Sequence, residues 1–210
     1  MLRSIFSYFA LFLFSITLVN AQSKINEQGV RYPTEEELAA SKRMAERLRH
    51  PTLIRMRLLW YPKDPTQEQP TDTPPPIETG NFMDFRLIVS HTYPEHLVYW
   101  QFVDPYLDVR PELLKDGDIV SYTKVANENV ERTENSVGTG SGAPSELLPG
   151  KEYEWSSVRL EEWYKPLGPG RYQLTIRRRF AWDGDWLESN PVIFEILPKE
   201  KNAGKSATKP

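Results

Sequence analysis

The stretch RYQLTIRRRFAWDGDWLESNPVIFEIL, residues 171–197, decides the fold, because apolar residues recur at every second position on both sides of a turn. A three-residue loop at 183–185 predicts an antiparallel hairpin with Leu174 opposite Phe194, and a one-residue slip would scatter its apolar pairs. The predicted pairs are Trp182 with Trp186, Ile176 with Val192, Leu174 with Phe194, and Tyr172 with Ile196. The predicted core face of the hairpin consists of Tyr172, Leu174, Ile176, Phe180, Val192, Phe194 and Ile196. Arg178 and Glu188 interrupt this face, and as diagonal neighbours we expect them to satisfy each other.

Shorter stretches upstream show the same two-residue period. Residues 54–61 alternate as in a half-buried strand, similar faces follow at 83–89 and 98–102, and a further strand contains Tyr153 and Trp155. The dipeptide Asp116-Gly117 suits a hairpin turn that needs positive φ. Short strands with regular turns and only one helix indicate a β-sandwich or a barrel. The side chains predicted to share the strand faces are Ile54, Met56, Leu58, Trp60, Met83, Phe85, Leu87, Val89, Val98, Trp100 and Phe102.

The predicted helix follows a polar linker, and together they occupy residues 22–51. Thr34 stands three residues before Glu37, which is the spacing of a capping box. We expect the helix to run to about Arg49 and to stop before Pro51. Its apolar stripe is thin, so we expect a surface element that docks on something larger.

Two loops and a tail complete the organisation. Residues 62–80 are rich in proline, which predicts an exposed, partly polyproline-like loop. Residues 135–145 are rich in glycine and serine, which predicts a second long loop. Residues 198–210 lack large apolar side chains and carry several lysines, so we expect a disordered basic tail.

One local motif resembles a known family. Leu167-Gly168-Pro169-Gly170-Arg171-Tyr172 resembles the entry to the penultimate strand of immunoglobulin-like and fibronectin type III-like domains, in which a tyrosine hydroxyl anchors the corner. Trp100 resembles the buried tryptophan of the third core strand, and Leu174 stands where an antibody-type domain has its second cysteine. The resemblance implies a mainly β fold: an immunoglobulin-like antiparallel β-sandwich over residues 52–197, with one N-terminal helix, in a secreted protein of bacterial type. It implies a scaffold rather than an activity.

Composition bounds the compartment and the chemistry. The 210 residues carry 26 Lys and Arg against 29 Asp and Glu, a net charge of −3 that argues against a nucleic-acid-binding protein. The absence of cysteine excludes disulfides, thiolate metal sites and a thiol nucleophile. Arg3, the apolar run 5–19 and the small residues before Gln22 predict a signal peptide over residues 1–21, and therefore a secreted or periplasmic protein. The run is shorter than the ~20 residues of a spanning helix, so we expect no permanent membrane span.

The histidines His91 and His96 form one candidate metal site. If the strands around Tyr93-Pro94 form a direct hairpin, the two imidazoles face each other and are able to share zinc or copper. An immunoglobulin-like topology would instead place these strands in different sheets. The usual structural zinc signatures are missing, which favours histidines without a metal. We expect no cofactor.

Cationic and aromatic residues supply the candidate binding sites. Arg171, Arg177 and Arg179 are predicted to share the outward face of one strand. They would form either a positive stripe that binds an acidic partner or a face whose charge is balanced by carboxylates on neighbouring strands. Trp163-Tyr164 offer a stacking platform for sugar rings or, alternatively, packing in the core. Because alternate residues of a strand point to the same side, the predicted hairpin places Trp182 and Trp186 on the core side.

No motif brings an acid, a base and a cleft together, so we predict that the protein is not an enzyme. The expected function is that of a secreted or periplasmic binding or adaptor module, because loops on rigid sheets commonly carry recognition. Its expected partner is another extracytoplasmic protein or a glycan. The alternatives are an inhibitor of a secreted hydrolase, acting through the loop around Tyr93-Pro94, and a carbohydrate-binding module.

Overall fold

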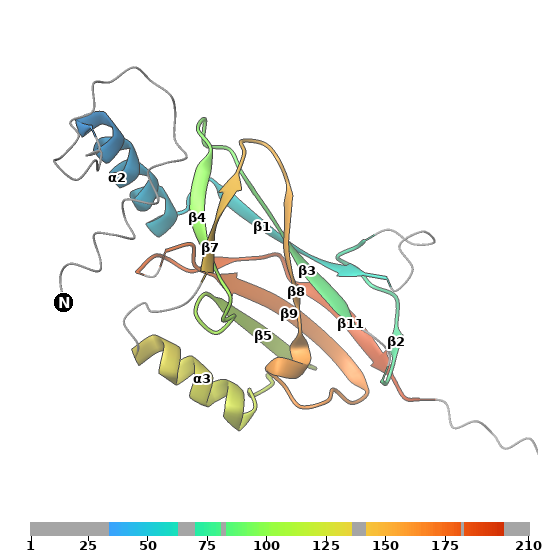
Figure 1. Ribbon diagram of the computed structural model, residues 1–210. Helices are drawn as coiled ribbons and strands as arrows, with labels where there is room; N and C mark the ends of the chain where they lie inside the picture. Colours follow the sequence, from blue (N-terminus) through green and yellow to red (C-terminus); the bar gives the residue numbers. More distant parts are fainter. Residues whose placement is uncertain (1–33, 63–69, 81–82, 136–141, 182, 200–210) are drawn as a thin grey trace, which may run out of the picture.

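The computed structural model describes residues 34–62, 70–80, 83–135, 142–181 and 183–199, which form a mainly β structure (Figure 1). The predicted signal peptide at 1–21, the linker residues 22–33, Trp182 and the tail from residue 200 onward lie outside this described part. The predicted mainly β class is confirmed, but the expectation of a single helix is wrong. A second α-helix, α3 (Lys124–Asn135), accompanies α2 (Glu35–Arg49) within the described residues.

The described strands are arranged in three sheets, and all of their pairings are antiparallel except that of β2 with β11. The three-stranded sheet has the order β1 (Ile54–Tyr61), β3 (Asp84–His91), β8 (Tyr153–Val158). The six-stranded sheet has the order β2 (Ile77–Glu78), β11 (Val192–Leu197), β9 (Gly170–Arg178), β5 (Val109–Lys115), β6 (Asp118–Ile119), and β10 (Leu187–Glu188) also pairs with β9. The remaining pair is β4 (Leu97–Phe102) with β7 (Gly142–Leu147).

One core lies between the two larger sheets. Phe85 of β3 contacts Phe194 of β11 with ring centroids 5.1 Å apart, and Phe194 stacks on Tyr172 of β9 at 5.3 Å. The side chains of β1 alternate between buried and more exposed positions, as the two-residue period predicts. The whole predicted face of the hairpin is buried: Tyr172, Leu174, Ile176, Phe180, Val192, Phe194 and Ile196.

The predicted register of that hairpin is wrong by two residues. Leu174 pairs with Val192, and Tyr172 pairs with Phe194. The reason is a longer connection: β10 begins only at Leu187, opposite Arg178, so residues 183–185 do not join two paired strands directly, and the Asp185 N–H donates to the Arg49 carbonyl of helix α2. A shift of two residues keeps each side chain on its face, so the buried set is unchanged. Arg178 also does not pair with Glu188 but with Asp108, at 2.5 Å.

Helix α2 begins and ends where the sequence predicts. The Thr34 N–H donates to Glu37 Oε2 at 2.7 Å and the Glu37 N–H donates to Thr34 Oγ1 at 3.2 Å, which completes the capping box. Leu48 is the buried residue of this helix. Figure 1 shows α2 beside β4, where Met44 Sδ accepts a hydrogen bond from the Val98 N–H.

Strand β4 and the predicted loops differ from expectation. Leu97 and Tyr99 enter the core cluster, whereas Val98 is buried near α2 and Phe102 is only half-buried; the side chain of Trp100 lies outside the described part. Within the predicted glycine- and serine-rich loop, residues 142–145 belong to β7, which pairs with β4. Within the proline-rich stretch, residues 77–78 form β2 and Ile77 is buried. Both segments were mistaken because their partner strands are distant in the sequence.

The turn predicted at Asp116-Gly117 is confirmed. Asp116 has φ +52° and Gly117 has φ +95°, and the turn joins β5 to β6 with Lys115 paired to Asp118. Positive φ at both central positions is what a tight hairpin turn of this hand requires. This hairpin forms one border of the surface described below.

Replacement of Tyr172 with phenylalanine is expected to lower the free energy of unfolding by about 1 kcal/mol. The Tyr172 hydroxyl donates to the Gly168 carbonyl at 2.8 Å, and the substitution removes this bond while it keeps the stacked ring. Urea denaturation of both proteins measures the difference. An unchanged midpoint would mean that water replaces the bond at no cost.

Candidate functional site

The exposed side of the six-stranded sheet is the candidate site. Along β9, Tyr172, Leu174 and Ile176 are buried, whereas Arg171 is exposed and Gln173 is half-buried. Strand β11 alternates strictly, whereas Thr175 of β9 and Arg110 of β5 are buried on this side of the sheet. We call this surface the outer face and define it by Glu112, Leu114, Ile119, Arg171, Gln173, Arg177, Ile193, Glu195 and Leu197.

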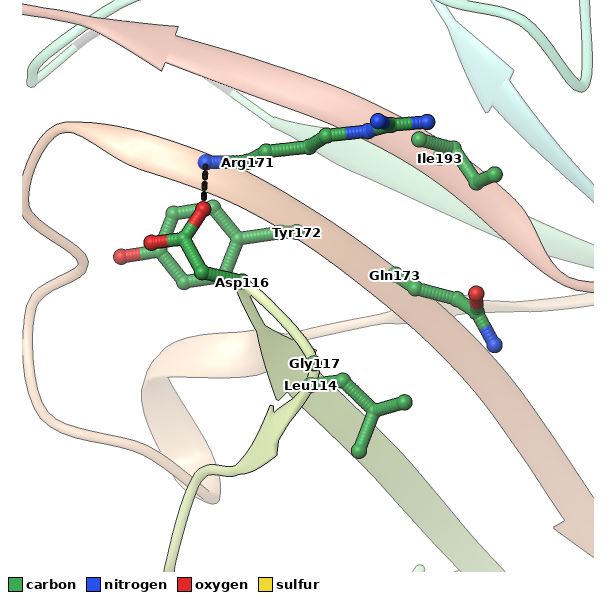
Figure 2. A pocket seen from close by; sticks show the side chains of 7 residues that line it. All are labelled: Leu114, Asp116, Gly117, Arg171, Tyr172, Gln173 and Ile193. Atoms are coloured by element: carbon green, nitrogen blue, oxygen red, sulfur yellow. Dashed lines mark hydrogen bonds between the residues drawn. The ribbon is translucent and has the colours of Figure 1, made fainter.

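A shallow hollow of about 370 Å³ opens at the β5–β6 end of the outer face (Figure 2). Arg171 supplies a cation to it, and the Arg171 N–H donates to Asp116 Oδ1 at 3.3 Å. The hollow therefore combines apolar walls with groups that are able to accept and donate hydrogen bonds. Its lining consists of Leu114, Asp116, Gly117, Arg171, Tyr172, Gln173 and Ile193.

Exposed apolar side chains occur on strands β6 and β11 of the same sheet. Ile119 is 82% exposed, Ile193 is 41% exposed and Leu197 is 37% exposed. Ile119 pairs with Leu114 across β5 and β6, so both side chains point to the outer face. Apolar residues gathered on one face are more informative than scattered ones, because they indicate an interaction surface.

Trp186 and three arginines form a cluster at the other end of the outer face. The guanidinium carbons of Arg110, Arg177 and Arg179 lie 5.2, 5.6 and 5.1 Å from the centroid of the Trp186 ring. These distances allow cation–π attraction. Trp186 is half-buried on this side of the sheet, so its predicted place on the core side is wrong.

Carboxylates balance the arginines of the outer face. Arg177 Nε lies 3.1 Å from Glu112 Oε1, Arg110 Nη2 lies 3.3 Å from Glu134 Oε1 of α3, and Glu195 stands opposite Arg171 in the ladder. Arg179 donates to the Leu107 carbonyl at 2.8 and 3.1 Å, and burial, with the nearby Arg110, lowers its pKa. The surface carries both signs, in agreement with the balanced alternative of the sequence analysis.

Trp163 and Tyr164 are core residues and not a surface platform. Each is only 2% exposed. Trp163 contacts the rings of Tyr106 and Tyr122 at 4.5 and 5.2 Å, and the Tyr164 hydroxyl donates to the Pro111 carbonyl at 2.7 Å. Burial raises the pKa of Tyr122 to about 12 and that of Tyr164 further still. Their proposed role as a sugar platform is therefore wrong, because no face of either ring is open to a ligand.

The histidine pair of the candidate metal site is not formed. Strand β3 pairs with β1 and β8 and lies in a different sheet from β4, so the alternative without a direct hairpin between His91 and His96 is the one found. His91 is 1% exposed, and its Nε2 donates to the Leu147 carbonyl at 2.8 Å. Among the described residues, no three His, Cys, Asp or Glu side chains gather as metal ligands.

The partners of Arg178 and the place of Trp186 were not predicted from the sequence. Arg178 and Asp108 form an ion pair in which both side chains are almost fully buried, and the Arg178 guanidinium lies 3.2 Å from the ring centroid of Trp155. The only local signal was an arginine that interrupts an apolar face. The place of Trp186 was missed because it depends on the long β9–β10 connection, which no local pattern reveals.

No protein-family model matches the chain, and no curated protein matches it. In the described part of the chain, neither helix has the length and apolar character that crossing a bilayer demands.

Proposed function

We propose that the protein is an exported, non-enzymatic binding module on an immunoglobulin-like β-sandwich, and that the outer face binds another extracytoplasmic protein. The scaffold part is supported by the sheet orders β1-β3-β8 and β11-β9-β5-β6, which face each other across one core. The bond from Tyr172 to the Gly168 carbonyl is the one that the resemblance implies. Export is supported by the signal-peptide pattern of residues 1–21.

One observation carries the binding proposal: the outer face unites exposed apolar side chains with an arginine–tryptophan cluster. Interfaces between proteins are enriched in tryptophan, tyrosine and arginine, and their energetic centres are apolar patches with a polar rim. Ile119 and Ile193 supply the apolar part of the proposed interface. Arg171, Arg177 and Trp186 supply its charged and aromatic part.

This arrangement favours a protein partner over the two alternatives. A glycan-binding platform needs accessible ring faces, and Trp163 and Tyr164 are buried. A hydrolase inhibitor that acts through the Tyr93-Pro94 loop needs that loop to protrude. Tyr93 is instead 6% exposed and lies under the Arg47 guanidinium at 5.0 Å.

The combined change Arg171→Glu with Ile193→Asp is expected to weaken binding to the partner at least about tenfold, which corresponds to about 1.4 kcal/mol. The partner is first captured from the secreted or envelope fraction with the wild-type protein, and its affinity is then measured by titration calorimetry. Val125→Asp on helix α3 is the matched control, because Val125 is exposed at 63% and belongs to none of the strands that form the outer face. Equal affinities for all three proteins would refute the proposal.

A further inference from the structure

The carboxyl end of helix α2 is bound to the β9–β10 connection by its backbone. The Asp185 N–H donates to the Arg49 carbonyl at 2.6 Å. This carbonyl belongs to the last turn of α2, where no intrahelical donor is available for it. The connection therefore caps the helix, although the two segments are more than 130 residues apart in the sequence.

Gly184 permits this contact because it has no side chain. A Cβ atom at this position would lie 3.0 Å from Arg49 Cα and 3.1 Å from the carbonyl oxygens of Arg49 and Leu48. All three are backbone atoms, so none of them is able to rotate away. An alanine at 184 would therefore require α2 or the connection to move by a few tenths of an ångström, which strains the contact.

Two side-chain pairs surround the backbone contact. Arg49 Nε lies 2.9 Å from Asp183 Oδ2, and His50 Nδ1 lies 2.8 Å from Asp185 Oδ2. We call Arg49, His50, Asp183, Gly184 and Asp185 the latch. Helix α2 is also held outside the latch by the buried Leu48, by Met44, which accepts from the Val98 N–H, and by the ion pair of Arg47 with Glu95 at 2.6 Å.

The next residue after the latch is Trp186, which lies among the arginines of the outer face. We propose that docking of α2 through the latch holds Trp186 in the arginine cluster, so that release of α2 opens the proposed binding surface at this end. Only the effect of α2 release on partner binding rests on the proposed function. The coupling of α2 to Trp186 is a property of the chain itself and is testable without a partner.

The latch also contains a group that titrates near neutral pH. His50 faces Asp185 of the connection and Glu46 and Arg49 of its own helix, and Asp183 lies beside Arg49. The hydrogen bond to Asp185 and its negative charge raise the pKa of His50 above the ordinary value. The charged imidazole therefore strengthens docking at low pH, and its contribution disappears as the pH rises through the raised pKa.

Gly184→Ala is expected to speed amide hydrogen exchange in the last turn of α2 and to raise hydroxyl-radical oxidation of Trp186 severalfold, read by mass spectrometry. Oxidation of Trp163, which is 2% exposed, is the internal reference. Gly168→Ala is the matched control, because a Cβ there meets nothing within 4 Å and its φ is ordinary. If Gly184→Ala fails to fold, Arg49→Ala with His50→Ala weakens the latch without a clash, and Lys42→Ala is its control.

Faster exchange in α2 with unchanged oxidation of Trp186 would overturn the coupling, and so would unchanged exchange in both latch variants. Either result leaves the binding proposal standing, because that proposal is decided by the Arg171 and Ile193 changes. In the wild type, the oxidation of Trp186 relative to Trp163 is expected to be lower at about pH 5.5 than at about pH 8.5, and His50→Ala is expected to remove the difference. A wild-type ratio that does not change with pH would overturn the role of His50.

Discussion

Asp108→Ala is expected to destabilise the protein by about 3–5 kcal/mol, because it leaves the charge of Arg178 buried without a partner. Arg178 is 2% exposed and Asp108 is 3% exposed, and their side chains meet at 2.5 Å. Two further nitrogens of the Arg178 guanidinium, Nε and Nη1, have no hydrogen-bond partner among the described residues. The carboxylate of Asp108 is therefore the main compensation for this buried cation.

The Asp108–Arg178 ion pair is not expected to make the fold more stable than two apolar residues at the same positions would. Burial raises the pKa of Asp108 and lowers that of Arg178 to about 10, so the interior disfavours both charged forms even though each attracts the other. The double variant Asp108→Ala with Arg178→Met is therefore expected to recover most of the stability that Asp108→Ala loses.

Urea denaturation of the two variants and the wild type measures these differences. The control is Glu152→Ala, which breaks an ion pair with Arg57 in which both side chains are more than half exposed, and which is expected to cost less than about 1 kcal/mol. A loss for Asp108→Ala as small as that of the control would mean that water reaches Arg178. A double variant as unstable as the single one would show that the pair itself contributes stability.

Phe194→Ala is expected to lower the free energy of unfolding by about 3–5 kcal/mol, because it removes the ring that fills the space between the two larger sheets. The ring of Phe194 is 2% exposed and lies between Phe85 of β3 and Tyr172 of β9, at 5.1 and 5.3 Å. Neither neighbour is able to fill the space without moving its own strand, so a cavity remains.

The adjacent residue provides the control for this prediction. Ile193 lies on the same strand with its side chain on the outer face, 41% exposed, so Ile193→Ala is expected to cost much less than Phe194→Ala. Thermal and urea denaturation of the two variants compare the faces directly. Equal losses would contradict the assignment of Phe194 to the core and with it the packing of the sheets.

Much of the fold was predictable wherever a short-range pattern carries the information. The capping box of Thr34 and Glu37 placed α2, and the two-residue period placed β1 and the buried face of β9 and β11. Helix α3 was missed because it is polar, with Ala126 and Thr133 as its buried residues. Thr123 Oγ1 accepts from the Ala126 N–H at 3.2 Å, and this capping spacing was the signal that would have located it.

The candidate site was less predictable than the fold. The outward position of Arg171 follows from the two-residue period of β9. The carboxylates that balance the arginines come from β5, β11 and α3, which are distant in the sequence, so the period does not reveal them. For Trp163 and Tyr164 the sequence left a surface platform and core packing as alternatives, and the structure packs them against Tyr106, Tyr122 and Pro111. Burial of an aromatic residue outside a regular strand depends on what covers it, and no local pattern states that.

By itself, the sequence determined the strand periods, the cap of α2, the turn at Asp116-Gly117 and which side of the last hairpin is hidden, because each of these depends on neighbours a few residues apart. Only the tertiary structure decided the register of β9 with β11, the pairing of Arg178 with Asp108 and the place of Trp186. The physical reason is that a two-residue shift leaves the apolar pattern intact. The register found in the structure is accompanied by contacts with distant segments, among them the hydrogen bond from the Asp185 N–H to the Arg49 carbonyl of α2, which no local pattern reveals.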